Sequence, residues 1–285
     1  MALSQAMGLF GNGRTLYEKE AAADWKTAKV LIAVKTAPVP STAMGDTVCV
    51  AGIRLTHDGP EWIRLYPIPF RYLDNDMRFK KYQIVDVPVR PSAKDPRAES
   101  YNPDRDNIQI RDTLKPWKAR HPHVLPLSDD WTMCRLYRTT VDKLPAPSLA
   151  AIKPKLVTDL KVTLHPGWTR RERAKLEMHL NQGTLFGTEP DKKILEPPRF
   201  RGTYSYRCFE ADCKGHNQGM LDWEFTEFQR HHAADSDEVA IAAIRKRFFT
   251  EMCSPERGPI LFVGNQAKRH HTFSVLGIYR SISST

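Results

Sequence analysis

The chain has 285 residues, of which 41% are hydrophobic and 27% charged, as in globular proteins with a hydrophobic core. Its length favours two domains over one large β-rich domain, and its formal net charge of +10 favours a polyanionic partner such as nucleic acid. No apolar run reaches the roughly 18 residues needed to span a bilayer, and the N-terminus lacks the pattern of a secretory signal. We therefore expect a cytoplasmic protein without a membrane anchor.

The N-terminal part is expected to be rich in short strands. Residues 1–27, with Gly8, Gly11 and Gly13, are predicted to be a flexible lead-in with one or two helical turns at most. Apolar runs and alternation, divided by turn signals such as Asp58-Gly59, predict four strands. They lie at residues 29–34, 47–55, 61–67 and 82–89. Strands at this spacing favour a small barrel of the OB-like or SH3-like kind.

The middle of the chain is more irregular. Residues 91–105 are polar and contain several prolines, which indicates a long loop of the kind that is usually functional or disordered. Residues 156–164 alternate as a strand does, and 169–181 read as a helix with Thr169 as N-cap and Glu172 completing a capping box. The proline-containing loop that follows suggests a division between a β-rich domain, 28–190, and a second domain, 191–285.

The last 85 residues are predicted to form an α+β unit. The expected elements are a strand at 203–208, helices at 221–228 and 237–252, and paired strands at 259–264 and 272–279. The fold class is therefore α+β and rich in β-structure, with an N-terminal barrel-like domain and a C-terminal α+β domain that carries a zinc-knuckle-like loop.

The spacing Cys208-x4-Cys213-x2-His216 is the most specific chemical pattern in the sequence. Zinc prefers thiolate and imidazole ligands in a tetrahedral arrangement, and an odd number of cysteines without an export signal favours free thiols and a metal site over disulfides. Cys253 is the favoured fourth ligand, with His231 and His232 as alternatives. The competing interpretation is two buried cysteines beside a surface histidine.

A second pattern would support catalysis. His216 lies close in sequence to Asp222 and Glu224, and one histidine with two carboxylates can hold a divalent metal for phosphodiester hydrolysis. On a regular helix, however, residues two apart diverge by about 200°, so the two carboxylates are not expected to share one ion. They are equally explained as acidic residues in the first turn of a helix.

Basic residues interleaved with aromatic ones suggest a nucleic-acid-binding surface. They occur along residues 62–71, on the helix that follows Thr169, and in the polar loop at 264–271, whose amide side chains can also pair with bases. The candidate residues are Arg64, Arg71, Arg170, Arg171, Arg173, Arg201, Asn265, Gln266, Lys268 and Arg269.

Three functions are compatible with these patterns. The first is a non-catalytic nucleic-acid-binding or sensing protein with a structural zinc site. The second is a metal-dependent nuclease or nucleotide-processing enzyme that uses the 216–224 segment, and the third is an interaction module in a larger assembly. Nucleotide-driven motors, dinucleotide oxidoreductases and α/β-hydrolases are disfavoured, because the sequence contains no P-loop, G-x-G-x-x-G or G-x-S-x-G string. DNA or RNA as partner, and the oligomeric state, stay open.

Overall fold

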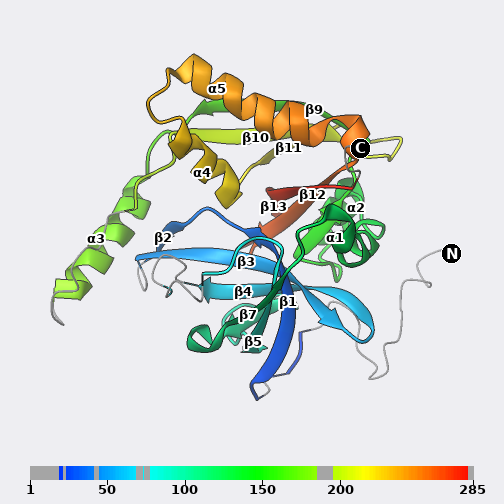
Figure 1. Ribbon diagram of the computed structural model, residues 1–285, viewed down its shortest axis with the longest axis vertical. Helices are drawn as coiled ribbons and strands as arrows, with labels where there is room; N and C mark the ends of the chain where they lie inside the picture. Colours follow the sequence, from blue (N-terminus) through cyan, green and yellow to red (C-terminus); the bar gives the residue numbers. More distant parts are fainter. Residues whose placement is uncertain are drawn as a thin grey trace.

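The computed structural model describes residues 19–21, 24–41, 45–68, 73, 78–184 and 195–281. Its N-terminal part is a β-barrel, drawn in blue and cyan in the lower half of Figure 1. The strands of this part are β1 (Lys26–Lys35), β2 (Val39–Ser41), β3 (Gly45–Thr56), β4 (Gly59–Ile68), β5 (Gln83–Pro91), β6 (Ser100–Pro103) and β7 (Gln109–Thr113). The predicted lead-in, 1–27, falls mostly outside the described residues.

Five strands close the barrel in the order β1-β3-β4-β6-β5, and β5 returns to pair with β1. The pairings are antiparallel except that of β4 with β6, which is parallel. β2 extends the sheet from β3, and β7 extends it from β5. The order β5-β1-β3-β4 is that of a Greek key, and a five-stranded Greek-key barrel is the architecture of OB folds. The predicted barrel is therefore confirmed.

β1 is buried on both of its faces, which explains the continuous apolar run in its sequence. Val30 and Ile32 point into the barrel core, whereas Leu31 and Ala33 belong to a second core shared with the C-terminal part. Successive side chains of a strand point to opposite faces, so a strand that is buried on both faces must be apolar at every position.

The C-terminal part consists of two three-stranded sheets and the helices that cover them. In chain order its main elements are α1 (Trp117–Val124), α2 (Met133–Val141), β8 (Leu149–Ile152), β9 (Leu156–Leu164), α3 (Arg170–Thr184), β10 (Phe200–Arg207), β11 (His216–Gly219), α4 (Trp223–His231), α5 (Asp237–Arg245), a π-helical turn η5 (Lys246–Thr250), α6 (Glu251–Cys253), β12 (Pro259–Gln266) and β13 (Arg269–Arg280). One sheet has the order β11-β10-β9 and the other β13-β12-β8. Figure 1 shows α5 lying along the first of these sheets. Among the described residues, no helix has both the length and the apolarity needed to cross a membrane.

The predicted helices are present, with shifted ends. The capping box is confirmed, because Thr169 donates through Oγ1 to Glu172 at 2.7 Å and accepts from the backbone N–H of Glu172. α4 begins at Trp223 because Asp222 is its N-cap. The helix predicted at 237–252 starts after the N-cap Ser236, as expected, and continues through the π-helical turn into α6. The short elements β2, β6, β7, α1, α2, β8 and β11 were not predicted.

The pairing of strands concerns the domain boundary that the sequence predicts at residue 190. β9 pairs with β10 along its length, and β8 pairs with β12, so strands on the two sides of residue 190 share the same sheets. β8 and β9 therefore lie in the same sheets as the strands that follow residue 190. A boundary at 190 would separate hydrogen-bonded neighbours.

The polar segment 91–105 joins the two parts of the molecule. It contains β6 rather than being irregular throughout. Glu99 accepts hydrogen bonds from the backbone N–H and the hydroxyl of Ser148, at 2.7 and 2.9 Å. Because Ser148 precedes β8, these bonds fix the segment against the C-terminal part.

Candidate functional site

Three cysteines and one histidine converge beside the end of β10. Cys134 lies in the first turn of α2, Cys208 directly follows β10, Cys213 lies in the following turn, and His216 begins β11. The Nε2 atom of His216 is 3.2, 3.4 and 3.5 Å from the sulfur atoms of Cys134, Cys208 and Cys213. All four candidate ligand atoms lie within 4.8 Å of one another. This Cys3His cluster can hold a metal ion.

The turn between β10 and β11 has the shape that such a cluster needs. His216 pairs with Tyr206 across the two strands, and the backbone N–H of Cys208 donates to the sulfur of Cys213 at 3.2 Å. Gly215 has a φ of +97°, in the left-handed region where glycine carries no steric penalty. The chain can therefore reverse tightly enough to bring Cys213 and His216 to one centre.

Helix α2 supplies the remaining thiol. Its N-cap Thr132 accepts from the backbone N–H of Arg135 at 3.0 Å. The N–H groups of Met133 and Cys134 donate to the sulfur of Cys208, which places the positive end of the helix next to a group that is anionic in a metal complex. Glu210, in the turn, accepts from Thr132 and from Arg138. These contacts tie the turn to α2.

The protonation of the four side chains reflects their crowding. Burial, followed by the neighbouring sulfur atoms, raises the pKa of Cys134 to about 12, and burial raises the pKa of Cys208. Partial burial works against ionisation of Cys213, but N–H donors from Cys208 and Gly215 lower its pKa. Burial also lowers the pKa of His216, which favours the neutral imidazole that binds metals. A cation at the centre would favour the thiolates.

The fourth ligand is a correction to the sequence analysis. Cys253 is 4% exposed, and its thiol donates to the carbonyl of Phe248 at 3.3 Å, away from the cluster. His232 is paired with Asp235 at 2.7 Å, and His231 lies exposed at the end of α4. Cys134 takes the fourth position. It stands far from the other three ligands in the sequence and on a helix that was not predicted, so spacing alone gave no signal for it.

The structure does not bring the three candidate catalytic residues together. His216 belongs to the Cys3His cluster, whereas both carboxylates face the ammonium of Lys81, at 3.5 Å for Asp222 and 3.1 Å for Glu224. Asp222 is the N-cap of α4 and accepts from the N–H of Glu224 at 3.0 Å. The two carboxylates therefore do share a cation, contrary to expectation, because Asp222 lies before the regular helix. That cation is a lysine side chain.

The Lys81–Asp222 pair is deeply buried, with 7% and 4% of the two side chains exposed. Burial raises the pKa of Asp222 to about 6, although Lys81 opposes the shift. The pKa of Lys81 is raised despite its burial, because Asp222 and Glu224 stabilise the ammonium. The pair joins the turn before β5 to the start of α4, and so holds the barrel against the C-terminal part.

Two of the candidate nucleic-acid-binding residues lie in the interior. Arg64 is 3% exposed and donates to the sulfur of Cys49 at 3.1 Å and to the carbonyl of Ser148 at 3.2 Å. Asn265 is 6% exposed and donates to the carbonyl of His270 at 2.7 Å. Both side chains hold protein groups together, so neither is part of a binding surface. Arg71 lies outside the described residues.

The other candidates are on the surface, in two groups. Arg170, Arg171 and Arg173 are exposed on α3, and Gln266, Lys268 and Arg269 are exposed at the turn between β12 and β13. Arg201, on β10, is also exposed and donates to the hydroxyl of Thr163 at 3.1 Å.

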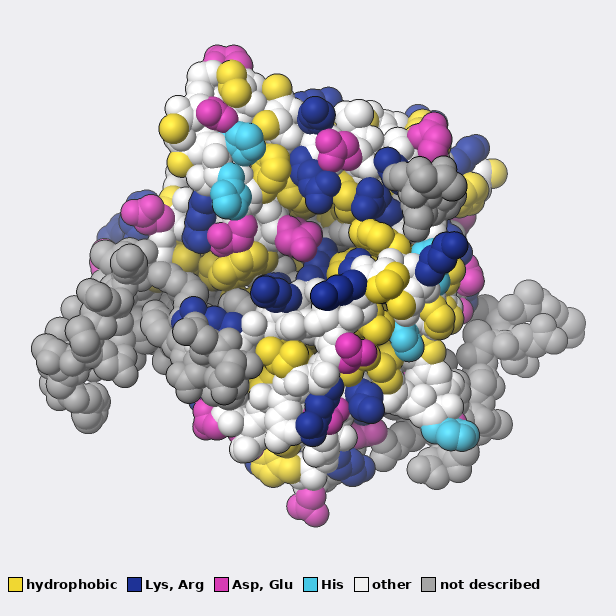
Figure 2. Space-filling view, in the orientation of Figure 1, with side chains coloured by type: hydrophobic (Ala, Val, Ile, Leu, Met, Phe, Trp, Pro, Cys, Tyr) yellow, Lys and Arg dark blue, Asp and Glu magenta, His cyan; other side chains and the backbone are white. Residues whose placement is uncertain are grey.

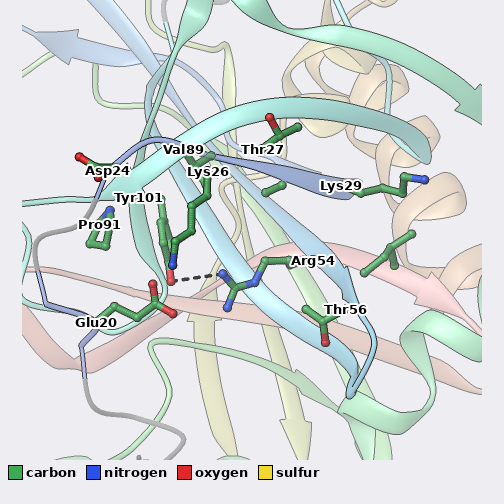
Figure 3. Close-up of a pocket in the computed structure, with 12 residues that line it drawn as sticks. Glu20, Asp24, Lys26, Thr27, Lys29, Arg54, Thr56, Val89, Pro91 and Tyr101 are labelled. Carbon is green, nitrogen blue, oxygen red and sulfur yellow. Dashed lines mark hydrogen bonds between the residues drawn. The ribbon is translucent and has the colours of Figure 1, made fainter. Parts of the chain in front are cut away.

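A separate pocket of about 210 Å³ lies at the edge of the barrel, where Lys26, Arg54 and Tyr101 meet the N-terminal segment (Figure 3). Arg54 donates to Glu61 at 3.1 Å and to the hydroxyl of Tyr101 at 3.4 Å. Acidic and basic side chains line the pocket together, and the main cation is already paired. The pocket therefore has no chemistry of its own that would mark it as a site.

Comparison with known proteins identifies families without a described activity. Residues 26–126 match a family model described as a domain of unknown function, DUF8758, and residues 129–285 match a second one, DUF8757. The two matches meet between α1 and α2, near the junction of the barrel with the C-terminal part. No curated protein matches the chain. Because the second match covers more than half of its length, the chain belongs to the family described as a domain of unknown function, DUF8757.

Proposed function

We propose that this protein binds nucleic acid without catalysis and that a structural zinc ion stabilises its C-terminal part. The spacing within the Cys3His cluster carries the zinc proposal. Zinc lies about 2.3 Å from thiolate sulfur and about 2.0–2.1 Å from imidazole nitrogen, so tetrahedral ligands are separated by about 3.6 Å from sulfur to nitrogen. The three sulfur-to-nitrogen distances of 3.2, 3.4 and 3.5 Å fit this value. Four protein ligands fill the coordination shell, which favours a structural ion.

Zinc would cross-link two parts of the chain that are distant in sequence. Cys134 comes from α2 and the other ligands from the turn between β10 and β11, so the free energy of metal binding becomes free energy of folding. A thiolate centre also fits a reducing compartment, and we propose the cytoplasm as its location.

Elemental analysis of the purified protein tests this proposal. We expect one zinc per chain in the native protein, and loss of zinc in Cys134→Ser and Cys213→Ser. Cys253→Ser is the matched control, because serine can donate the same hydrogen bond to Phe248 and the residue lies outside the cluster. Retention of a full equivalent of zinc in Cys134→Ser would contradict the assignment, and loss in Cys253→Ser would restore the ligand predicted from sequence.

The free surface cations support the nucleic-acid proposal. Arg170, Arg171, Lys268 and Arg269 are exposed, and none of them forms an ion pair with another described residue. They belong to a chain with a net charge of +10, in which such residues can release counterions from phosphates. The Greek-key barrel adds support by analogy only, since OB folds bind oligonucleotides but a fold does not determine function.

The dependence of nucleic-acid affinity on salt concentration tests the proposal that the protein binds nucleic acid. Binding of fluorescent single-stranded DNA and RNA is measured over a series of salt concentrations, and log K should fall linearly with log salt. Arg171→Gln combined with Lys268→Gln should reduce the magnitude of the slope by up to about 1.4, at about 0.7 per phosphate contact. The matched control is Arg111→Gln combined with Arg230→Gln, since both arginines are already paired with carboxylates. A flat salt dependence would instead favour an interaction module.

A further inference from the structure

The sheet β11-β10-β9 has one covered face and one open face. Along its central strand, β10, buried side chains alternate strictly with side chains that reach solvent. The buried ones pack in one core with residues of α4 and α5. Because successive side chains of a strand point to opposite faces, the others share the outer face of the sheet. They are Arg201, Thr203, Ser205 and Arg207.

The neighbouring strands add polar side chains to the same face. Arg201 donates to the hydroxyl of Thr163, its cross-strand partner on β9, at 3.1 Å. Ser205 donates to the side-chain carbonyl of Asn217, its partner on β11, at 2.6 Å. The described residues of this face therefore form an ordered polar surface, and none of them carries an aromatic ring.

Positive charge on the outer face exceeds negative charge. Lys161, Arg201 and Arg207 are exposed there, and none of them forms an ion pair with another described residue. Asp159 is the one acidic residue that the three described strands present on this face, and it is already paired with Arg245 of α5 at 2.9 Å. An anion that meets the face therefore finds three cations and no unpaired carboxylate.

The opposite side of the same sheet has a different charge pattern. The helices α4 and α5 carry both acidic and basic residues along their length. Figure 2 shows acidic and basic side chains interspersed where these helices cover the C-terminal part. The excess of unpaired cations on the outer face is therefore not shared by the helical side.

The first turn of α3 continues the basic surface at one end of the sheet. Burial lowers the pKa of His165, Glu172 opposes this shift and Arg201 adds to it. Arg201 and the first turn of α3 therefore lie near the same imidazole. Arg170 and Arg171 precede Glu172 in that turn and are exposed, so cations of the sheet and of α3 can contact one ligand.

We propose that the outer face of β11-β10-β9, with the first turn of α3, binds the sugar–phosphate backbone of double-stranded nucleic acid. This inference rests on the proposed function, to which it adds the surface and the form of nucleic acid. Arginine, lysine, serine, threonine and asparagine are side chains that commonly contact phosphate oxygens.

The dimensions and composition of the face favour a duplex. Arg201 and Arg207 lie at the two ends of a row on β10, and a strand rises about 3.3 Å per residue, so the row spans about 20 Å. A duplex presents one charge per about 1.7 Å of its axis, so a row of this length faces several phosphates. Proteins that hold single strands stack the bases on aromatic rings, and the described part of this face offers none.

The first measurement compares the two forms of nucleic acid with the full-length protein. Fluorescence anisotropy is measured with a short labelled DNA duplex, a second duplex of unrelated sequence, and one labelled strand alone. Both duplexes should bind with equal affinity, because phosphate contacts carry no sequence information. The single strand should bind more weakly than either duplex.

Thr203 offers a matched pair of variants at the centre of the face. It lies opposite Lys161 on β9 and Gly219 on β11, and a Cβ at Gly219 would meet no atom within 4 Å, so a longer side chain has space. Thr203→Glu places a negative charge among the cations and should weaken duplex binding by about tenfold or more. Thr203→Gln has the same length without the charge and should bind nearly as the native protein does.

Removal of two cations tests the same surface through the salt dependence. Lys161→Gln combined with Arg201→Gln should reduce the slope of log K against log salt by up to about 1.8 in magnitude, at about 0.9 per phosphate contact on a duplex. Lys115→Gln combined with Lys118→Gln removes the same net charge from exposed residues at the start of α1 and should leave the slope nearly unchanged. Circular dichroism and thermal unfolding establish that each variant is folded.

The outcomes separate this inference from the proposed function. If the native protein binds nucleic acid with a salt-dependent affinity, but Thr203→Glu and the Lys161→Gln/Arg201→Gln variant bind equally well, the surface is wrongly assigned and the proposed function stands. Tighter binding of the single strand than of the duplexes would overturn the assignment to a duplex. If the native protein binds neither form, the proposed function and this inference fail together.

Discussion

Arg97 donates a hydrogen bond of 2.6 Å to the backbone carbonyl of Asn265, and so connects the segment after β5 with the end of β12. The same guanidinium is held by Asp95, at 2.9 Å from Nε and 2.5 Å from Nη2. The polar segment 91–105 is therefore ordered by contacts with residues far away in the sequence. Its composition alone indicates a long loop and gives no sign of these partners.

Replacement of Arg97 by alanine should destabilise the protein by about 2–3 kcal/mol. The side chain of Arg97 is 11% exposed. Its loss removes the guanidinium that pairs with the Asp95 carboxylate and the side-chain donor to the Asn265 carbonyl. Chemical denaturation, followed by tryptophan fluorescence, measures the change. Arg111→Ala is the matched control, because Arg111 pairs with Asp86 while 53% exposed, and should cost less than about 1 kcal/mol. Equal effects of the two substitutions would contradict the structural role of Arg97.

Asp95 should make stability depend on acidic pH. Burial opposes its ionisation, but hydrogen bonds from Arg97 and Ser100 lower its pKa to about 2. A depressed folded-state pKa contributes stability that is complete above the ordinary value near 4 and is lost as the pH falls through about 2. Asp95→Asn should therefore cost about 1–2 kcal/mol near pH 7, allowing for solvent screening. Denaturation at a series of pH values should show the two proteins converging below pH 4. A difference that stays constant down to pH 2 would rule out this linkage.

Replacement of Gly215 should reduce both the stability of the protein and its affinity for metal. Its φ of +97° is strained for any residue with a Cβ, so Gly215→Ala should cost about 1–2 kcal/mol. Zinc affinity should fall as well, because the turn that holds Cys213 and His216 is distorted. Gly219→Ala, in β11, is the control, since an added Cβ meets no atom there within 4 Å. Competition with a chromogenic chelator measures affinity, and equal affinities of the two variants would show that the turn tolerates a side chain.

These positions show how far sequence reasoning extends. Local patterns were sufficient for the capping box of Thr169 and Glu172, for four of the five strands that close the barrel, and for three candidate ligands within nine residues of one another. Interactions across the fold were not accessible, because spacing in the chain says nothing about them. Cys134 joins the cluster only through the packing of α2. Arg64 reads as a surface cation beside aromatic residues, yet its strand carries it into the interface between the two parts.

Lys81 provides the strongest test of how the two parts are held together. Its ammonium is the cation that faces Asp222, which is almost fully buried, so Lys81→Met leaves a carboxylate in the interior without its partner. Breaking a buried ion pair from one side typically costs about 3–5 kcal/mol, and we expect a loss of about 3 kcal/mol at neutral pH, because Glu224 is half exposed and can be solvated. Denaturant unfolding measures the change.

A second substitution should recover most of that loss. Asp222→Asn removes the unpaired charge from the Lys81→Met protein but keeps a side chain that can still cap α4. The cost of Lys81→Met should also shrink as the pH falls. The pKa of Asp222 is already raised to about 6 by burial in the native protein, and it should rise further without Lys81. Acid therefore protonates the unpaired carboxylate and removes its charge. If the double variant is as unstable as Lys81→Met, and acid gives no recovery, the loss comes from packing of the lysine stem rather than from charge.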